Sequence, residues 1–119
     1  MIPVNRRTKV FVCREFIDMR ASYDSLFSKV KSILKQDPYS GHLFLFINKK
    51  RNSVKCLSYD GTGLVLICKR LDKGTFSKIN PFYPNDIAMS QAEFSLYFEG
   101  ADLKKRFIES PKNNRESST

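Results

Sequence analysis

The sequence predicts an α+β domain: an antiparallel β-meander sheet of four to five strands, with one long amphipathic helix on a face and a short C-terminal helix. Three observations support this fold. Residues 37–76 contain three apolar runs separated by turns with glycine or asparagine, a pattern typical of a meander. Residues 18–36 repeat apolar side chains at three- and four-residue spacing, as a helix does. A chain of 119 residues is the size of one domain.

The first predicted strand covers residues 9–13, which read K-V-F-V-C and are rich in β-branched and aromatic side chains. The predicted helix follows at residues 18–36 and packs on one face of the sheet. Asp18 or Ser22 is expected to cap its first turn. Pro38 limits its end, because a proline disfavours helical backbone at the preceding residue.

The next three strands are predicted at residues 42–47, 54–59 and 64–70, joined by connections at 48–53 and 60–63 and followed by a third turn at 71–74. Short connections join antiparallel neighbours, so these strands form the meander. The run at 42–47 is almost continuously apolar. It is either covered on both faces or presents its aromatic side chains as a surface patch.

After an irregular loop at residues 77–87, the spacing of Ser90 and Glu93 is that of a capping box and opens a short helix. This helix is expected to close an edge of the sheet. Residues 1–108 are assigned to a single domain. Residues 109–119 have the polar composition of a disordered tail.

The charge balance favours a polyanion as partner. The chain has 21 Lys and Arg against 12 Asp and Glu, a net charge of +9, which is typical of nucleic-acid-binding domains. The alternative is a solvated cationic surface. Turns of a meander alternate between its ends, so the first and third turns are expected at one end. The candidate DNA-contacting residues are Arg20, Lys49, Lys50, Arg51, Lys55, Lys69 and Arg70.

The sequence favours neither a metal site nor an enzyme. The residues Cys13, His42, Cys56 and Cys68 have the composition of a zinc site, but they lie in separate strands and not in close pairs. We therefore interpret the cysteines as buried apolar side chains and expect no cofactor.

Five carboxylates are candidates for metal-dependent phosphoryl transfer: Asp18, Asp37, Asp60, Glu99 and Asp102. Helix caps and turns explain their positions better, so no catalytic residue is assigned. No apolar run is long enough for a signal peptide or a membrane span. A cytoplasmic protein without membrane contact is expected.

Several short motifs occur in a fixed order: Asp18-Met19-Arg20, Gly41-His42-Leu43-Phe44, Asp60-Gly61 with Gly63-Leu64, and Lys69-Arg70-Leu71. With this pattern, the chain resembles the TnpB-type accessory proteins over roughly residues 1–102. These proteins are encoded by the second open reading frame of insertion sequence sixty-six type transposable elements. The chain departs from the family pattern at Ser58-Tyr59 and at Leu103, where the family usually has tryptophan.

The resemblance implies a small bacterial protein that is encoded beside a separate transposase and assists transposition without catalysis. We therefore expect a non-catalytic accessory protein that binds DNA, the element-encoded transposase, or both through its basic turns. The alternative is a pure protein-interaction module. Such a module docks on the transposase through exposed aromatic residues of the run 43–47 and makes no DNA contact.

Overall fold

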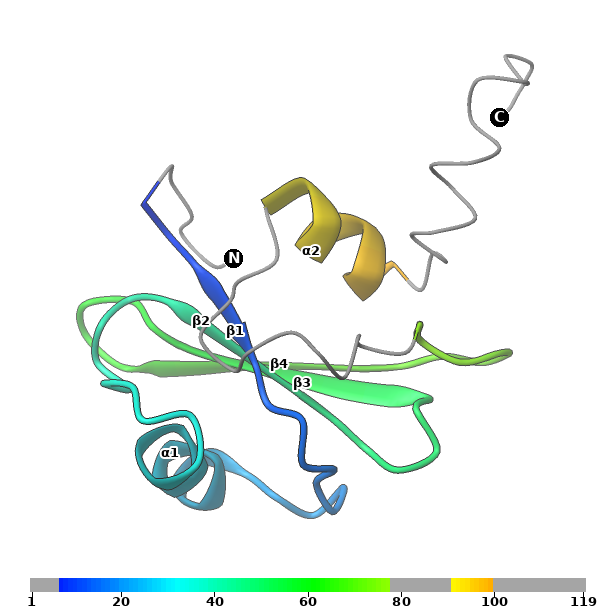
Figure 1. Ribbon diagram of the computed structural model, residues 1–119, viewed down its shortest axis with the longest axis horizontal. Helices are drawn as coiled ribbons and strands as arrows, with labels where there is room; N and C mark the ends of the chain where they lie inside the picture. The colour runs from blue at the N-terminus through cyan, green and yellow to red at the C-terminus, as the bar shows by residue number, and fades with distance from the viewer. Residues whose placement is uncertain (1–6, 78–90, 100–119) are drawn as a thin grey trace.

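The structure, a computed structural model, describes residues 7–77 and 91–99. Its elements are β1 (Val10–Val12), α1 (Tyr23–Ser32), β2 (Leu43–Ile47), β3 (Ser53–Tyr59), β4 (Leu64–Arg70) and α2 (Gln91–Phe98). The strands form one sheet in the order β1-β2-β3-β4. Figure 1 shows this sheet edge-on, with α1 on one side and α2 on the other. The α+β class is confirmed. The predicted loop from residue 78 onward, the Ser90 cap, the domain boundary at 108 and the tail lie outside the described residues.

The sheet is mixed, so the prediction of a wholly antiparallel sheet was wrong. β1 pairs with β2 in parallel, with Val10 opposite Leu43. Strands β2, β3 and β4 pair antiparallel, as the meander predicted. The difference lies in the connections. Two short turns join the meander strands, whereas β1 reaches β2 through α1, and a connection of that length can return the chain in its original direction.

The helix α1 is shorter than the predicted span of residues 18–36, because backbone reversals bound it on both sides. Ser22 is the N-cap, and its backbone N–H donates to Ser25 Oγ at 3.2 Å. Beyond the C-terminal end, Lys35 adopts a φ of 56°, and the Gln36 N–H donates to the Val30 carbonyl oxygen at 3.1 Å. A single left-handed residue is enough to stop a helix.

Strand β2 is covered on both faces. All five of its residues are buried. One cluster packs Phe44, Phe46 and Leu57 beneath the α1 residues Leu26 and Val30.

The second cluster lies on the opposite face, where the α2 residue Tyr97 packs with Phe76 against alternate residues of β1, β2 and β3. Thus α2 covers a face of the sheet. The sequence-based prediction that this helix closes an edge was wrong. Of the two alternatives for the run 43–47, coverage on both faces is confirmed. The alternative of exposed aromatic residues was wrong, because α1 covers Phe44 and Phe46.

A charged side chain anchors the turn that precedes α1. Lys55, in the middle of β3, is only 8% exposed. Its Nζ donates to the carbonyl oxygen of Met19 at 2.8 Å and to that of Ala21. Within the turn, the Arg20 guanidinium forms two hydrogen bonds with the Asp18 carboxylate, and these hold the pKa of Asp18 down at about 2. Lys55 therefore fastens this turn to the sheet.

Replacing Lys55 by Met should lower the free energy of unfolding by about 1–3 kcal/mol, because two partly buried carbonyl groups lose their donor. The measurement is denaturant unfolding, combined with amide hydrogen exchange of residues 18–21, which should accelerate. Lys49→Met is the matched control, since Lys49 is exposed. Equal stability and exchange in the two variants would contradict an anchoring role for Lys55.

The single histidine of the chain joins the chain before β1 to the start of β2. His42 Nδ1 accepts the backbone N–H of Lys9 at 3.0 Å, and its ring meets the edge of Phe11 at a centroid distance of 5.6 Å. Partial burial, followed by the nearby charge of Lys9, lowers the pKa of His42 below the ordinary value of 6.5. The folded protein therefore favours neutral imidazole, because a protonated Nδ1 would face a donor.

Stability should fall as the pH decreases through and below about 6.5, because the unfolded chain takes up the histidine proton more readily than the folded chain does. Above this range both states hold neutral imidazole and the effect is absent. Proton NMR of the single imidazole should give a folded-state pKa below 6.5, and His42→Gln should remove this part of the pH dependence. An imidazole pKa above 6.5 would contradict the assignment.

Candidate functional site

The first and third turns of the meander lie side by side at one end of the sheet, as predicted. The Leu71 N–H donates to the Asn52 carbonyl oxygen at 2.8 Å, and the Phe76 N–H donates to that of Arg51 at 2.7 Å. The first of these bonds continues the β3–β4 ladder past its last pair, Ser53 with Arg70. The second brings the end of the third turn back to the β2–β3 loop. Basic residues that are about twenty positions apart in the sequence are thereby brought to one end of the sheet.

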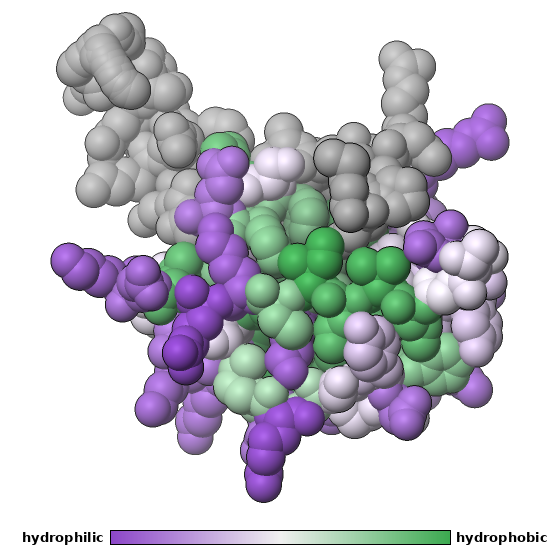
Figure 2. All heavy atoms as spheres, turned by 180° about the vertical axis from the view of Figure 1, so that it is seen from behind, coloured by the Kyte–Doolittle hydropathy of each residue, from purple (hydrophilic) through white to green (hydrophobic). Residues whose placement is uncertain are grey.

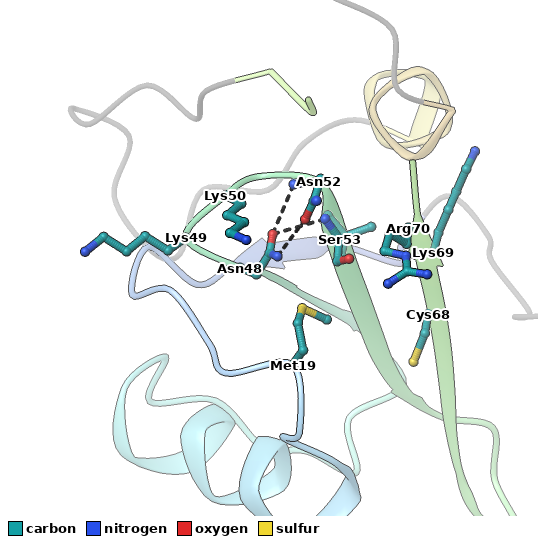
Figure 3. A pocket seen from close by; sticks show the side chains of 10 residues that line it. Met19, Asn48, Lys49, Lys50, Asn52, Ser53, Cys68, Lys69 and Arg70 are labelled. Carbon is teal, nitrogen blue, oxygen red and sulfur yellow. Dashed lines mark hydrogen bonds between the residues drawn. The ribbon is translucent and has the colours of Figure 1, made fainter. Parts of the chain in front are cut away.

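An open depression of about 620 Å³ lies at this end (Figure 3). We call it the basic depression. Four of its described lining residues are Lys or Arg and none is acidic. The lining consists of Met19, Asn48, Lys49, Lys50, Asn52, Ser53, Val54, Cys68, Lys69 and Arg70. Such a surface attracts anions, because no neighbouring carboxylate in this lining offsets its positive charge.

The loop between β2 and β3 is held in one conformation by Asn48. Its Oδ1 accepts the backbone N–H of Asn52 at 3.1 Å and that of Ser53 at 3.0 Å, while its Nδ2 donates to Asn52 Oδ1 at 2.7 Å. Figure 3 shows this network at the base of the loop that carries Lys49 and Lys50. Because the loop backbone is ordered before any ligand binds, less conformational entropy is lost on binding.

Only some of the seven candidate cations belong to this surface. Lys49, Lys50 and Arg70 are exposed and line the basic depression. No described carboxylate forms a salt bridge with any of the three. In Figure 3, Lys49 extends outward from the loop. These three are the cations best placed to meet an anionic partner.

Lys69 and Arg51 have partners within the protein. Lys69 contributes to the lining of the basic depression, but it points from β4 in the direction opposite to Cys68 (Figure 3). Its Nζ lies over the Phe98 ring of α2 at 5.7 Å from the centroid. Arg51 is half-buried and its Nη1 approaches the Phe76 carbonyl oxygen at 3.5 Å. Both contacts reduce the freedom of these cations to reach a ligand.

The remaining two candidates have structural contacts. Lys55 is buried and its ammonium group donates to the carbonyl groups of the turn before α1, so it is poorly placed to reach a phosphate. Arg20 is fully exposed at its side chain, yet its guanidinium is paired with Asp18, with Nε and Oδ1 separated by 3.0 Å. The sequence did not reveal the partners of Lys55, because Lys55 and Met19 are 36 positions apart.

Several residues of the basic depression were not identified from the sequence. Met19, Cys68 and the two asparagines were absent from the candidate set. The asparagines carried a usable signal, because Asn48 and Asn52 flank a basic loop at a separation of four residues, and Asn side chains commonly hydrogen-bond to nearby backbone in turns.

Cys68 had been interpreted as buried, and the structure places it on the surface. Strand β4 is an edge strand, and α1 does not extend over its C-terminal half.

The other two cysteines are buried. Burial raises the pKa of the Cys13 thiol, and it raises that of Cys56 to about 12. Thiols with raised pKa values are poor nucleophiles at neutral pH. In residues 7–77 and 91–99, no cluster of three His, Cys, Asp or Glu side chains has the arrangement of a metal site.

Two of the carboxylates considered earlier act within local turns. Asp60 Oδ1 accepts the backbone N–H groups of Thr62 and Gly63 and the Thr62 hydroxyl. These bonds lower the pKa of Asp60. Asp37 accepts the Tyr39 N–H in the same manner. Glu99 lies at the end of α2, and Asp102 is outside the described residues.

Of the two described helices, neither has the length and apolar character needed to cross a membrane.

Comparisons with known proteins match nearly the whole chain. The family model described as IS66 Orf2 like protein matches residues 8–107. Two relatives from Sinorhizobium fredii, the uncharacterized proteins y4jC and y4hO, are 32% and 33% identical to the chain. The first alignment covers 93% of this chain and 97% of the relative, and the second covers 87% and 90%. No solved structure matches the chain.

The family model covers the meander, both helices and the whole basic depression. Its description refers to the second open reading frame of an insertion sequence, which suggests a protein associated with transposition. The motifs in the sequence therefore indicated the correct family. The chain belongs to the IS66 Orf2-like family.

Proposed function

We propose that the protein is a non-catalytic accessory factor for transposition, and that its basic depression binds the phosphate backbone of DNA. The observation that carries the proposal is the convergence of the basic β2–β3 loop and the basic end of β4 around a surface whose described lining has no carboxylate. Family membership supplies the biological context, since transposable elements are mobilised as DNA. The element-encoded transposase is the second proposed partner.

Lys50 and Arg70 are the central contacts in this proposal, with Lys49 beside them. Lys50 lies in the loop before β3 and Arg70 at the end of β4. The β3–β4 ladder and the bond from Leu71 to Asn52 hold these two segments side by side. Cations of this kind bind phosphates by releasing condensed counterions, which gives affinity with little choice of sequence. The asparagine network orders the loop that carries Lys50 and therefore favours binding without rearrangement.

The binding should depend steeply on salt. In a salt series with labelled element-end DNA and random DNA, the logarithm of the association constant should fall linearly with the logarithm of the salt concentration. Lys50→Ala and Arg70→Ala should each weaken binding to both DNAs and reduce that slope by about one unit. Fluorescence anisotropy at several salt concentrations measures both quantities.

Lys31→Ala is the matched control, because it also removes one charge but lies on α1 and not among the residues that line the basic depression. Its slope should equal that of the parent protein. Absent or salt-independent binding at low ionic strength would contradict the DNA proposal. That outcome would favour a protein-interaction module that acts on the transposase alone.

A further inference from the structure

Within residues 7–77 and 91–99, one edge of strand β4 pairs with no other strand. β4 is the last strand of the sheet order and pairs there with β3 alone. Because the Leu71 N–H points to Asn52, and backbone groups alternate along a strand, odd-numbered residues of β4 direct their N–H and C=O groups toward β3. The backbone groups of Leu64, Leu66, Cys68 and Arg70 therefore point away from the sheet, where another strand can bind them.

This edge has few of the features that prevent an edge strand from pairing with a strand of another chain. It is seven residues long, and all four residues at its start are apolar and half-buried: Leu64, Val65, Leu66 and Ile67. Figure 2, the view from behind, shows a hydrophobic band across the side of the molecule opposite β1. Monomeric proteins usually protect such edges with charges, prolines or short strands. Here the charges are confined to Lys69 and Arg70 at one end.

We propose that β4 pairs antiparallel with β4 of a second copy of this chain, forming a two-fold symmetric dimer. Full overlap of the two strands pairs Leu64 with Arg70 of the second copy and Leu66 with Cys68 of the second copy. All of these residues direct their backbone groups outward, so each pair closes two hydrogen bonds. With four strands in each copy, the dimer has a continuous sheet of eight strands.

The distribution of charge on and beside β4 favours a second copy in this orientation. Antiparallel pairing separates the two Lys69-Arg70 ends and places each beside the apolar start of the other β4. The basic end of each β4 then lies next to the other copy's turn before β4, in which Asp60 is exposed. Parallel pairing would instead bring like charges together, which is destabilising. The isologous contact is also closed, so it does not extend into fibres.

The dimer has a consequence for the basic depression. The side chains of Leu66, Cys68 and Arg70 share one face of β4, the α1 face, because Leu66 packs with the α1 cluster and side chains alternate along a strand. A two-fold axis perpendicular to the sheet keeps both α1 faces on the same side. Two basic depressions therefore lie on one face of the dimer.

Sedimentation equilibrium of the full chain tests the proposal. The parent protein should be dimeric at micromolar concentration in about 0.5 M salt, and dimerisation should strengthen with salt, because each copy carries a net charge of +9 whose repulsion is screened. Cys68→Pro removes an outward N–H and leaves the β3 ladder intact, so it should raise the dimer dissociation constant by at least about tenfold. Cys68→Ser keeps the N–H and should dimerise like the parent protein.

A cross-linking experiment tests the register independently of the stability of the proline variant. Mild oxidation of Leu66→Cys should yield a disulfide-linked dimer, because the introduced thiol faces Cys68 of the second copy at a spacing of about 5.5 Å between Cα atoms. Adding Cys68→Ser to that variant should abolish the product. A monomeric parent protein, a dimer insensitive to Cys68→Pro, or no cross-linked product would each overturn the proposal.

The dimer and the DNA proposal can fail separately, because salt affects them in opposite directions. Salt weakens binding to phosphates and strengthens association of like-charged copies. Loss of DNA binding in Lys50→Ala should leave the dimer intact. Residue 68 lines the basic depression, so DNA binding by Cys68→Pro is compared with that of Cys68→Ser, which changes the same side chain but keeps the dimer. Sedimentation and anisotropy on these variants therefore distinguish the two outcomes.

Discussion

The burial of β2 on both faces is the constraint on which the rest of the structure depends. Its five residues are apolar and buried, so each face of the sheet needs its own cover. The helix α1 covers one face and α2, with Phe76, covers the other. A sheet covered in this way has little room for charge at its centre, because a buried ion without partners is costly. The cations of the meander, Lys55 excepted, are therefore concentrated in the turns and at the end of β4, where the basic depression forms.

Lys55 is the exception that shapes this end of the sheet. It lies in the middle of β3, opposite Phe46 on one side and Cys68 on the other. The cost of burying its ammonium group is offset by the carbonyl oxygens of Met19 and Ala21. The same bonds hold Met19 against the sheet, where it lines the basic depression. Lys55 was predicted to contact DNA. In the structure it instead supports the surface on which the other cations lie.

The exposed surface of β4 divides into an apolar edge and a charged end. The edge offers backbone groups and aliphatic side chains, which suit another strand. The end offers exposed cations, which suit phosphates. Arg70 belongs to both, since its backbone lies on the free edge and its side chain lines the basic depression. An accessory protein that combines these two surfaces has a physical means of presenting two basic depressions to the same DNA.

The sequence by itself determined the meander from β2 to β4, because turn residues such as Asn48 and Asp60 act through hydrogen bonds that span only a few positions. It also determined the family. A closer application of the two-residue strand period would have placed Lys69 and Arg70 on opposite faces of β4. Only the tertiary structure decided that β1 runs parallel to β2, that α2 covers a face and that Lys55 is buried. Each of these features depends on contacts between segments far apart in the chain, and local sequence patterns carry no information about which distant segments will meet.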